Sequence, residues 1–168
     1  AAFADRMNLL RESGLARAVC TRARQGVPLL GICLGMQFLF DSSSEGGITP
    51  GLGLLPGTVE AIPGHTTQGQ PLRVPHIGWA PLYPAQQREG FSGSTLEAIP
   101  VKSQVYFVHG YRAMPAHQAD RLADTLYGGH RICAAVQRGN ITGVQFHPEK
   151  SGEVGLAILR TFLGSCPA

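Results

Sequence analysis

The chain has 168 residues, of which 43% are hydrophobic and 15% charged, and this length and composition predict one globular domain rather than a disordered chain. Lys and Arg outnumber Asp and Glu by 14 to 11, and a net charge of +3 is too small to indicate a broad nucleic-acid-binding surface. The longest nearly unbroken apolar stretch, residues 26–40, contains Pro28 and Gln37 and falls short of the roughly 20 apolar residues that cross a bilayer.

The first half of the chain predicts helices around one buried strand. Helical spacing of apolar residues indicates a first helix that ends at Gly14 and a second over Leu15–Gln25. The continuous apolar run Pro28–Ile32 is typical of a strand covered on both faces, and Leu34–Phe40 predicts a helix that begins directly after it. Turn-forming residues then predict a loop from Ser42 to Gly57.

The second half predicts strands and a closing helix, which makes the fold class α/β with some antiparallel strands. The helix is expected over Glu153–Leu163, where apolar residues recur on one face. The stretches Ile132–Gln137 and Ile141–Phe146 flank Arg-Gly-Asn and predict a hairpin. Three further strands are predicted at Thr58–Ile62, Leu72–Pro75 and Gln104–His109.

Cysteine and histidine spacing argues against a structural metal. Cys20, Cys33, Cys133 and Cys166 form no CxxC pair, and the six histidines form no HExxH or HxxxH pair. The first ten residues lack the apolar core of a secretory signal. Unpaired cysteines without such a signal favour the reducing cytoplasm.

Cys33 is the strongest candidate for a reactive residue. In LLGICLGMQ it lies between Gly31 and Gly35 at a predicted strand-to-helix junction, the arrangement of a nucleophile elbow, where a Cβ on either neighbour is expected to clash. The positive end of the helix is expected to lower the pKa of the thiol, and the Leu34 N–H is free to face an oxyanion. The alternative is a small core cysteine whose glycines only allow close packing.

His147 and Glu149 form a candidate partner pair for a thiol nucleophile. In GVQFHPEK, His147 ends an apolar strand, and Pro148 is expected to keep the backbone extended so that the Glu149 carboxylate orients the imidazole. The alternative is a strand-end histidine beside a surface glutamate.

Taken together, GICLGMQ (31–37) and GVQFHPEKS (143–151) resemble the class I glutamine amidotransferases. Three further segments, GLGLLPGTV (51–59), VPHIGW (74–79) and YFVHGYRA (106–113), resemble the glutaminase subunits of imidazole glycerol phosphate synthase in histidine biosynthesis. The resemblance spans nearly the whole chain. It implies a flavodoxin-like, three-layer fold with a mixed, mostly parallel central sheet, in a single domain over residues 1–168.

The resemblance also implies roles for matching residues. Cys33 is expected to be the nucleophile that forms a γ-glutamyl thioester, His147 the base and then the acid, and Glu149 the orienting carboxylate. The residues expected to hold the glutamine substrate are Gln37, Glu45, His109, Gly110 and Tyr111. No metal or organic cofactor is implied.

The implied partner is the cyclase subunit of the synthase, in a heterodimer through which ammonia passes. The interface residues that this implies are His76, Trp79, Tyr106 and Lys150. No nucleic-acid or membrane partner is expected.

The chain departs from the family pattern at three places. Gly110 stands where Ser or Thr is usual, and Ala80 stands where Asn is usual. Family members open with further strands, so we expect roughly 40 to 60 residues of the domain to precede Ala1. Three alternative functions stay open: another amidotransferase of the anthranilate synthase type, a non-catalytic interaction subunit if the missing strands are truly absent, and an unrelated cysteine hydrolase.

Overall fold

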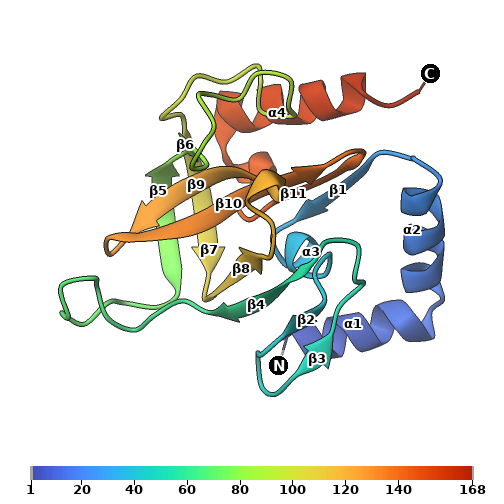
Figure 1. Cartoon of the computed structure of the whole chain (residues 1–168), viewed down its shortest axis with the longest axis horizontal. Coiled ribbons are helices and arrows are strands. Elements are labelled where there is room, and N and C mark those ends of the chain that lie inside the picture. The colour runs from blue at the N-terminus through green and yellow to red at the C-terminus, as the bar shows by residue number, and fades with distance from the viewer. Residues whose placement is uncertain (1, 168) are drawn as a thin grey trace.

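The computed structural model describes residues 2–167, in which helices pack on both sides of β-sheets (Figure 1). The helices are α1 (Ala2–Glu12), α2 (Leu15–Arg24), α3 (Leu34–Gln37) and α4 (Gly152–Gly164). The predicted helices at the two ends of the chain are confirmed. None of the helices in the described residues is long and apolar enough to cross a membrane.

A five-stranded sheet forms the centre of the molecule, in the order β1-β11-β10-β9-β6 (Figure 1). Its strands are β1 (Leu29–Ile32), β6 (Tyr83–Pro84), β9 (Arg121–Tyr127), β10 (His130–Arg138) and β11 (Ile141–Val144). The predicted hairpin is confirmed as β10 and β11, which pair antiparallel.

The central sheet is mixed, as predicted, but a majority of parallel pairs is wrong for the described strands, because of the four neighbouring pairs only β1 with β11 is parallel. Successive strands from β9 to β11 are joined by two-residue connections, which only antiparallel neighbours allow. Gly128 and Gly129 make the first connection with φ of 59° and 84°, the positive values that a tight hairpin turn requires.

Two smaller sheets complete the fold. One has the order β3-β2-β4-β8, and the other pairs β5 with β7. Their strands are β2 (Ser42–Ser43), β3 (Thr49–Pro50), β4 (Gly57–Ala61), β5 (His76–Pro81), β7 (Gln104–His109) and β8 (Tyr111–Pro115). The predicted strands Thr58–Ile62 and Gln104–His109 are thus confirmed, whereas the predicted loop Ser42–Gly57 contains two short strands.

Two other predictions of elements are wrong. The segment Leu72–Pro75 is not a strand, and β5 begins only at His76, because Pro75 has no N–H to donate to a ladder. The helix predicted over Leu34–Phe40 ends at Gln37. Carbonyl groups just beyond it accept from a neighbouring loop instead, with Leu52 N to Phe38 O at 2.7 Å and Leu54 N to Leu39 O at 2.8 Å.

Two apolar clusters pack on the central sheet. One joins Val144 and Phe146 to Ile158 of α4, and the other joins Val136 to Met36 of α3. This packing fixes α3, and with it the residue that precedes it, at the carboxyl end of β1.

Candidate active site

Cys33 connects β1 directly to α3 in a strained conformation. Its φ of 53° and ψ of −109° are values that a residue with a side chain rarely adopts. Its N–H donates to Val144 O at 2.8 Å, which ties the turn to β11. This confirms a sharp strand-to-helix turn with the cysteine at its tip, as in a nucleophile elbow.

Gly31 and Gly35, two positions before and after Cys33, differ in the space around them. A Cβ on Gly31 would lie 2.6 Å from Gly35 O and 2.9 Å from Met36 N, both backbone atoms that cannot move aside. A Cβ on Gly35 would meet nothing within 4 Å. The expectation that both positions exclude a side chain is therefore wrong for Gly35, because the close approach runs from β1 to α3 and only Gly31 faces it.

The Cys33 thiol is half-buried between polar groups. Gln145 Nε2 donates to Sγ at 3.7 Å, and Sγ lies 3.9 Å from Val108 O. Burial raises the pKa of Cys33 above its ordinary value, while hydrogen bonds from the Leu34 N–H and Gln145 lower it. The expected lowering of the pKa is thus wrong for the free protein: α3 has only four residues, and burial outweighs the field of so short a helix.

His147 and Glu149 form the predicted pair. Their side chains are joined by a hydrogen bond of 2.6 Å between His147 Nδ1 and Glu149 Oε1. The backbone between them is a 3₁₀ turn, Pro148–Lys150 (η2), rather than the expected extended segment. The His147 N–H donates to Tyr106 O at 3.0 Å, and Ser151 Oγ donates to His147 O at 2.6 Å, so both backbone groups of His147 are held.

Parallel pairing of β1 with β11 brings the thiol and this pair to the same end of the sheet. The register sets Ile32 beside Val144, so that Cys33 lies one residue past β1 and His147 three residues past the aligned position in β11. The charges of Glu149 and Lys150 both act on the Cys33 thiol, the first raising its pKa and the second lowering it. Cys33 and His147 are 114 positions apart in sequence, and this single pairing of strands brings them to the same end of the sheet.

Three of the predicted substrate residues meet at one carbonyl group. Gln37 is buried and donates from Nε2 to Tyr111 O at 3.3 Å, and His109 Nδ1 donates to the same oxygen at 2.8 Å. Glu45 is placed differently: its Oε1 accepts from Ala2 N at 3.2 Å. Gly110 O accepts from Ile62 N at 3.0 Å.

Gln145 belongs to this group but was not predicted from the sequence. Besides its contact with the thiol, its Oε1 accepts from Gln37 Nε2 at 3.1 Å. The available signal was a polar residue inside the apolar run GVQF, two positions before His147 and hence on the same side of an extended segment.

The predicted interface residues separate into exposed and buried ones. Trp79 is 55% exposed and its ring packs edge-on against Tyr106 at 6.0 Å between centroids, and Lys150 is also exposed. His76 is only 5% exposed and stacks between Phe107 and Tyr127. Placing His76 on a partner surface is therefore wrong, because strand alternation turns it inward.

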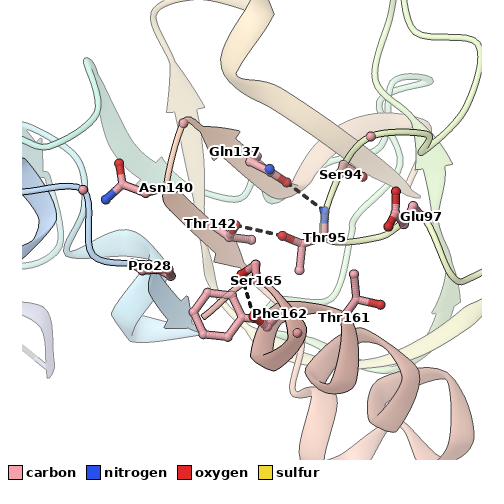
Figure 2. Close-up of a pocket in the computed structure, with 14 residues that line it drawn as sticks. Pro28, Ser94, Thr95, Glu97, Gln137, Asn140, Thr142, Thr161, Phe162 and Ser165 are labelled. Atoms are coloured by element: carbon pink, nitrogen blue, oxygen red, sulfur yellow. Dashed lines mark hydrogen bonds between the residues drawn. The ribbon is translucent and has the colours of Figure 1, made fainter. Parts of the chain in front are cut away.

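A cavity of about 660 Å³ lies at the other end of the central sheet, beside Pro28 and Asn140 where β1 and β11 begin. Figure 2 shows that polar groups in it pair with one another: Thr95 N donates to Gln137 Oε1 at 2.9 Å, and the hydroxyl groups of Thr95 and Thr142 lie 3.0 Å apart. None of the predicted site residues lines it. Within residues 2–167, no three His, Cys, Asp or Glu side chains are grouped as metal ligands.

Comparison with known proteins identifies the family, since residues 9–165 match glutamine amidotransferase class-I. The chain belongs to this family. It is 47% identical over 162 residues to imidazole glycerol phosphate synthase subunit HisH 1 of Legionella pneumophila strain Lens, covering 96% of this chain and 76% of that protein. It is also 47% identical to subunit HisH of Geobacillus thermodenitrificans, covering 96% and 73%, respectively. A third amidotransferase relative, the chloroplastic synthase hisHF of Arabidopsis thaliana, is 45% identical over 163 residues, which are 26% of its length.

Two solved structures confirm the fold class. A glutamine amidotransferase crystal structure superposes with a TM-score of 0.63 at 23% identity, covering 94% of this chain and 70% of the other. PurLQS from Thermotoga maritima gives 0.62 at 21% identity, covering 89% and 67%.

Proposed function

We propose that this amidotransferase is the glutaminase subunit of an imidazole glycerol phosphate synthase and that it hydrolyses glutamine at Cys33. The relatives at 45–47% identity carry the name of this synthase. The observation that carries the chemistry is the 2.6 Å hydrogen bond between His147 and Glu149, which lie just past β11, the strand that pairs in parallel with the one just before Cys33.

The first half of the reaction forms a thioester. Sγ of Cys33 attacks the side-chain carbonyl carbon of glutamine while the imidazole of His147 takes the thiol proton. Glu149 holds Nδ1 of the imidazole, which leaves Nε2 to accept that proton and stabilises the imidazolium. The proton then passes to the leaving nitrogen, so that ammonia departs and a γ-glutamyl thioester remains.

The second half releases glutamate. Water loses a proton to His147 and attacks the thioester carbon, and the thiol is regenerated when the imidazolium returns the proton to sulfur. The Leu34 N–H, which already interacts with the thiol, is proposed to donate to the oxyanion of both tetrahedral intermediates. Because burial raises the pKa of Cys33 in the free protein, we propose that His147 removes the thiol proton during attack on bound substrate.

Glutamine is proposed to bind beside the Tyr111 carbonyl. Both N–H groups of Gln37 are engaged by Tyr111 O and Gln145 Oε1, which leaves its own Oε1 to accept from the substrate. The backbone of Gly110 and Tyr111 is proposed to hold the α-carboxylate. Glu45 is proposed to bind the α-ammonium, for which its carboxylate must exchange the Ala2 N–H for the ligand.

The cyclase subunit is proposed to dock on the outer face of β5 and β7. The exposed Trp79 and the half-buried Tyr106 supply an aromatic pair there, with Lys150 as a nearby charge in η2. The Tyr106 carbonyl also accepts from the His147 N–H, so strand β7 contributes to the proposed docking face and holds the backbone of the proposed catalytic base. We propose that ammonia released at Cys33 passes to the partner at this face.

An electrophilic glutamine analogue tests the chemistry. Mass spectrometry of the protein, mixed with the cyclase subunit, is expected to find the analogue on Cys33 and to find labelling at least ~100-fold slower in a His147→Asn variant. Equal labelling of both proteins would contradict the role of His147. If neither protein is labelled, the chain is better explained as a non-catalytic subunit. If labelling is stimulated by an anthranilate-type synthase instead of the cyclase subunit, the partner is reassigned.

A further inference from the structure

Gln145 is a buried residue whose side chain contacts the Cys33 sulfur, and the mechanism above gives it no role. It follows β11 directly, its side chain is inaccessible to solvent, and its N–H donates to Ala134 O at 2.8 Å. A buried amide must satisfy its donors and acceptor locally, because water does not reach it.

The orientation of the Gln145 amide is fixed by Gln37. Gln37 Nε2 is a donor, so the Gln145 atom that lies 3.1 Å from it must be the oxygen. The Gln145 Nε2 therefore points toward Cys33 Sγ, at 3.7 Å. Without Gln37 the amide is free to turn its oxygen, which repels a thiolate, toward the sulfur.

We propose that Gln145 is a positioning residue that favours the thiolate of Cys33 during attack, with Gln37 holding its amide in the donating orientation. The catalytic use of that thiolate rests on the proposed function. The contact itself rests only on the geometry of the three side chains.

Deprotonation of the sulfur changes the strength of its contacts. The neutral thiol has an S–H for the Val108 carbonyl, 3.9 Å away, and this bond is lost when the proton leaves. The bond from Gln145 becomes charge-assisted at the same moment and strengthens. The hydrogen bond therefore stabilises the thiolate more than the thiol, which agrees with its lowering effect on the pKa of Cys33.

Other charges near the thiol act from the surface. Glu149 opposes the thiolate and Lys150 favours it, and both side chains are exposed on η2, where salt screens them. His147, on the same segment, is the titratable group proposed to take the proton. Gln145 is neutral and buried, so its contribution is expected to persist at high salt.

The test is the pH dependence of Cys33 alkylation by iodoacetamide, measured on the whole chain by mass spectrometry of the Cys33 peptide at 0.5 M salt. Gln145→Met removes the donor and retains side-chain length. It is expected to raise the apparent pKa of alkylation by about one pH unit, which is a roughly tenfold slower reaction below that pKa. Gln145→Asn, which keeps a buried amide but shortens its reach, is expected to show the same direction.

Two controls separate this role from a loss of structure. Gln137→Met removes another glutamine of the same sheet, whose Oε1 accepts from Thr95 N, and is expected to leave the Cys33 profile unchanged. Alkylation of Cys20 on α2 reports folding in each sample. A folded Gln145 variant with the wild-type alkylation profile overturns the proposal. If the profile shifts but the wild-type protein shows no glutaminase activity with the cyclase subunit, the proposal for Gln145 is supported and the proposed function is rejected.

Discussion

His109 and His76 place two imidazoles in the interior next to the proposed substrate residues, with ring centroids 5.5 Å apart. His109 Nδ1 donates to Tyr111 O, while its buried Nε2 and His76 Nδ1 have no partner among the described residues. Burial lowers the pKa of His109 to about 4 and lowers that of His76 as well. Both rings are therefore neutral at neutral pH, and a proton on either is held poorly.

Acid is expected to destabilise the fold through this pair. An unfolded histidine titrates near pH 6.5, whereas folded His109 titrates near 4. Between these pH values the unfolded state binds one more proton than the folded state, so the free energy of unfolding falls as pH falls. One such group contributes at most about 1.4 kcal/mol per pH unit. His109→Asn keeps an N–H for Tyr111 O and is expected to flatten the slope of unfolding free energy between pH 6.5 and 4.5 in urea titrations. An unchanged slope, matching that of the exposed His117→Asn control, would contradict this.

At the scale of elements, the shape of the turn between β1 and α3 was predictable from the sequence, whereas the pKa of the cysteine in it was not. The spacing of Gly31, Cys33 and Gly35 predicts the sharp turn, because such a turn is encoded locally. The raised pKa of Cys33 depends on burial by β7 and β11, which are distant in sequence, and so was mispredicted from the helix alone. For the same reason Gln145 was missed.

Strand β9 was missed because its pattern includes a charge. Asp124 is buried in the middle of β9, where an acidic residue disfavours a strand on sequence grounds. The fold stabilises it with Arg121, at 2.7 Å, and with Arg131 from β10, at 3.0 Å. Pairing between strands supplies these partners, and no pattern within Arg121–Tyr127 shows them.

The two glycines of the turn give a matched test at this scale. Gly31→Ala places a Cβ against backbone of α3 and is expected to destabilise the chain by about 2 kcal/mol or more, or to prevent folding. Gly35→Ala enters open space in a helix and is expected to be neutral or to stabilise by up to ~1 kcal/mol. Chemical denaturation of the two variants measures both effects. Equal destabilisation by the two substitutions would contradict the claim that β1 approaches α3 closely at Gly31 but not at Gly35.

On the scale of the whole molecule, the exposed Trp79 on β5, packed against Tyr106 on β7, predicts where a partner binds. Trp79→Ala is expected to weaken binding of the cyclase subunit about tenfold or more while leaving the melting temperature nearly unchanged, because Trp79 is 55% exposed in the chain. Titration calorimetry measures the affinity. Leu163→Ala, which truncates a 66% exposed residue of α4, is the control. Equal effects of the two substitutions would argue against a docking face on β5 and β7.

The family, its fold class and the antiparallel hairpin of β10 and β11 were predictable from motifs and turn signals in the sequence, whereas the pairing of β1 with β11 was not. The chain covers about three quarters of its bacterial relatives in length, and the parallel pairing of β1 with β11 is what joins the two motifs at one end of the sheet. That pairing is a contact between segments more than 100 residues apart, so it required the structure.

The central claim is that Cys33 releases ammonia from glutamine for a synthase partner, and replacing it separates the two activities most directly. In the complex with the cyclase subunit, Cys33→Ala is expected to abolish glutamine-dependent formation of imidazole glycerol phosphate, by ~10³-fold or more, and to leave formation from added ammonium salts intact. Product is measured with each nitrogen source for both proteins. Glutamine-dependent synthesis that survives in Cys33→Ala would contradict the account.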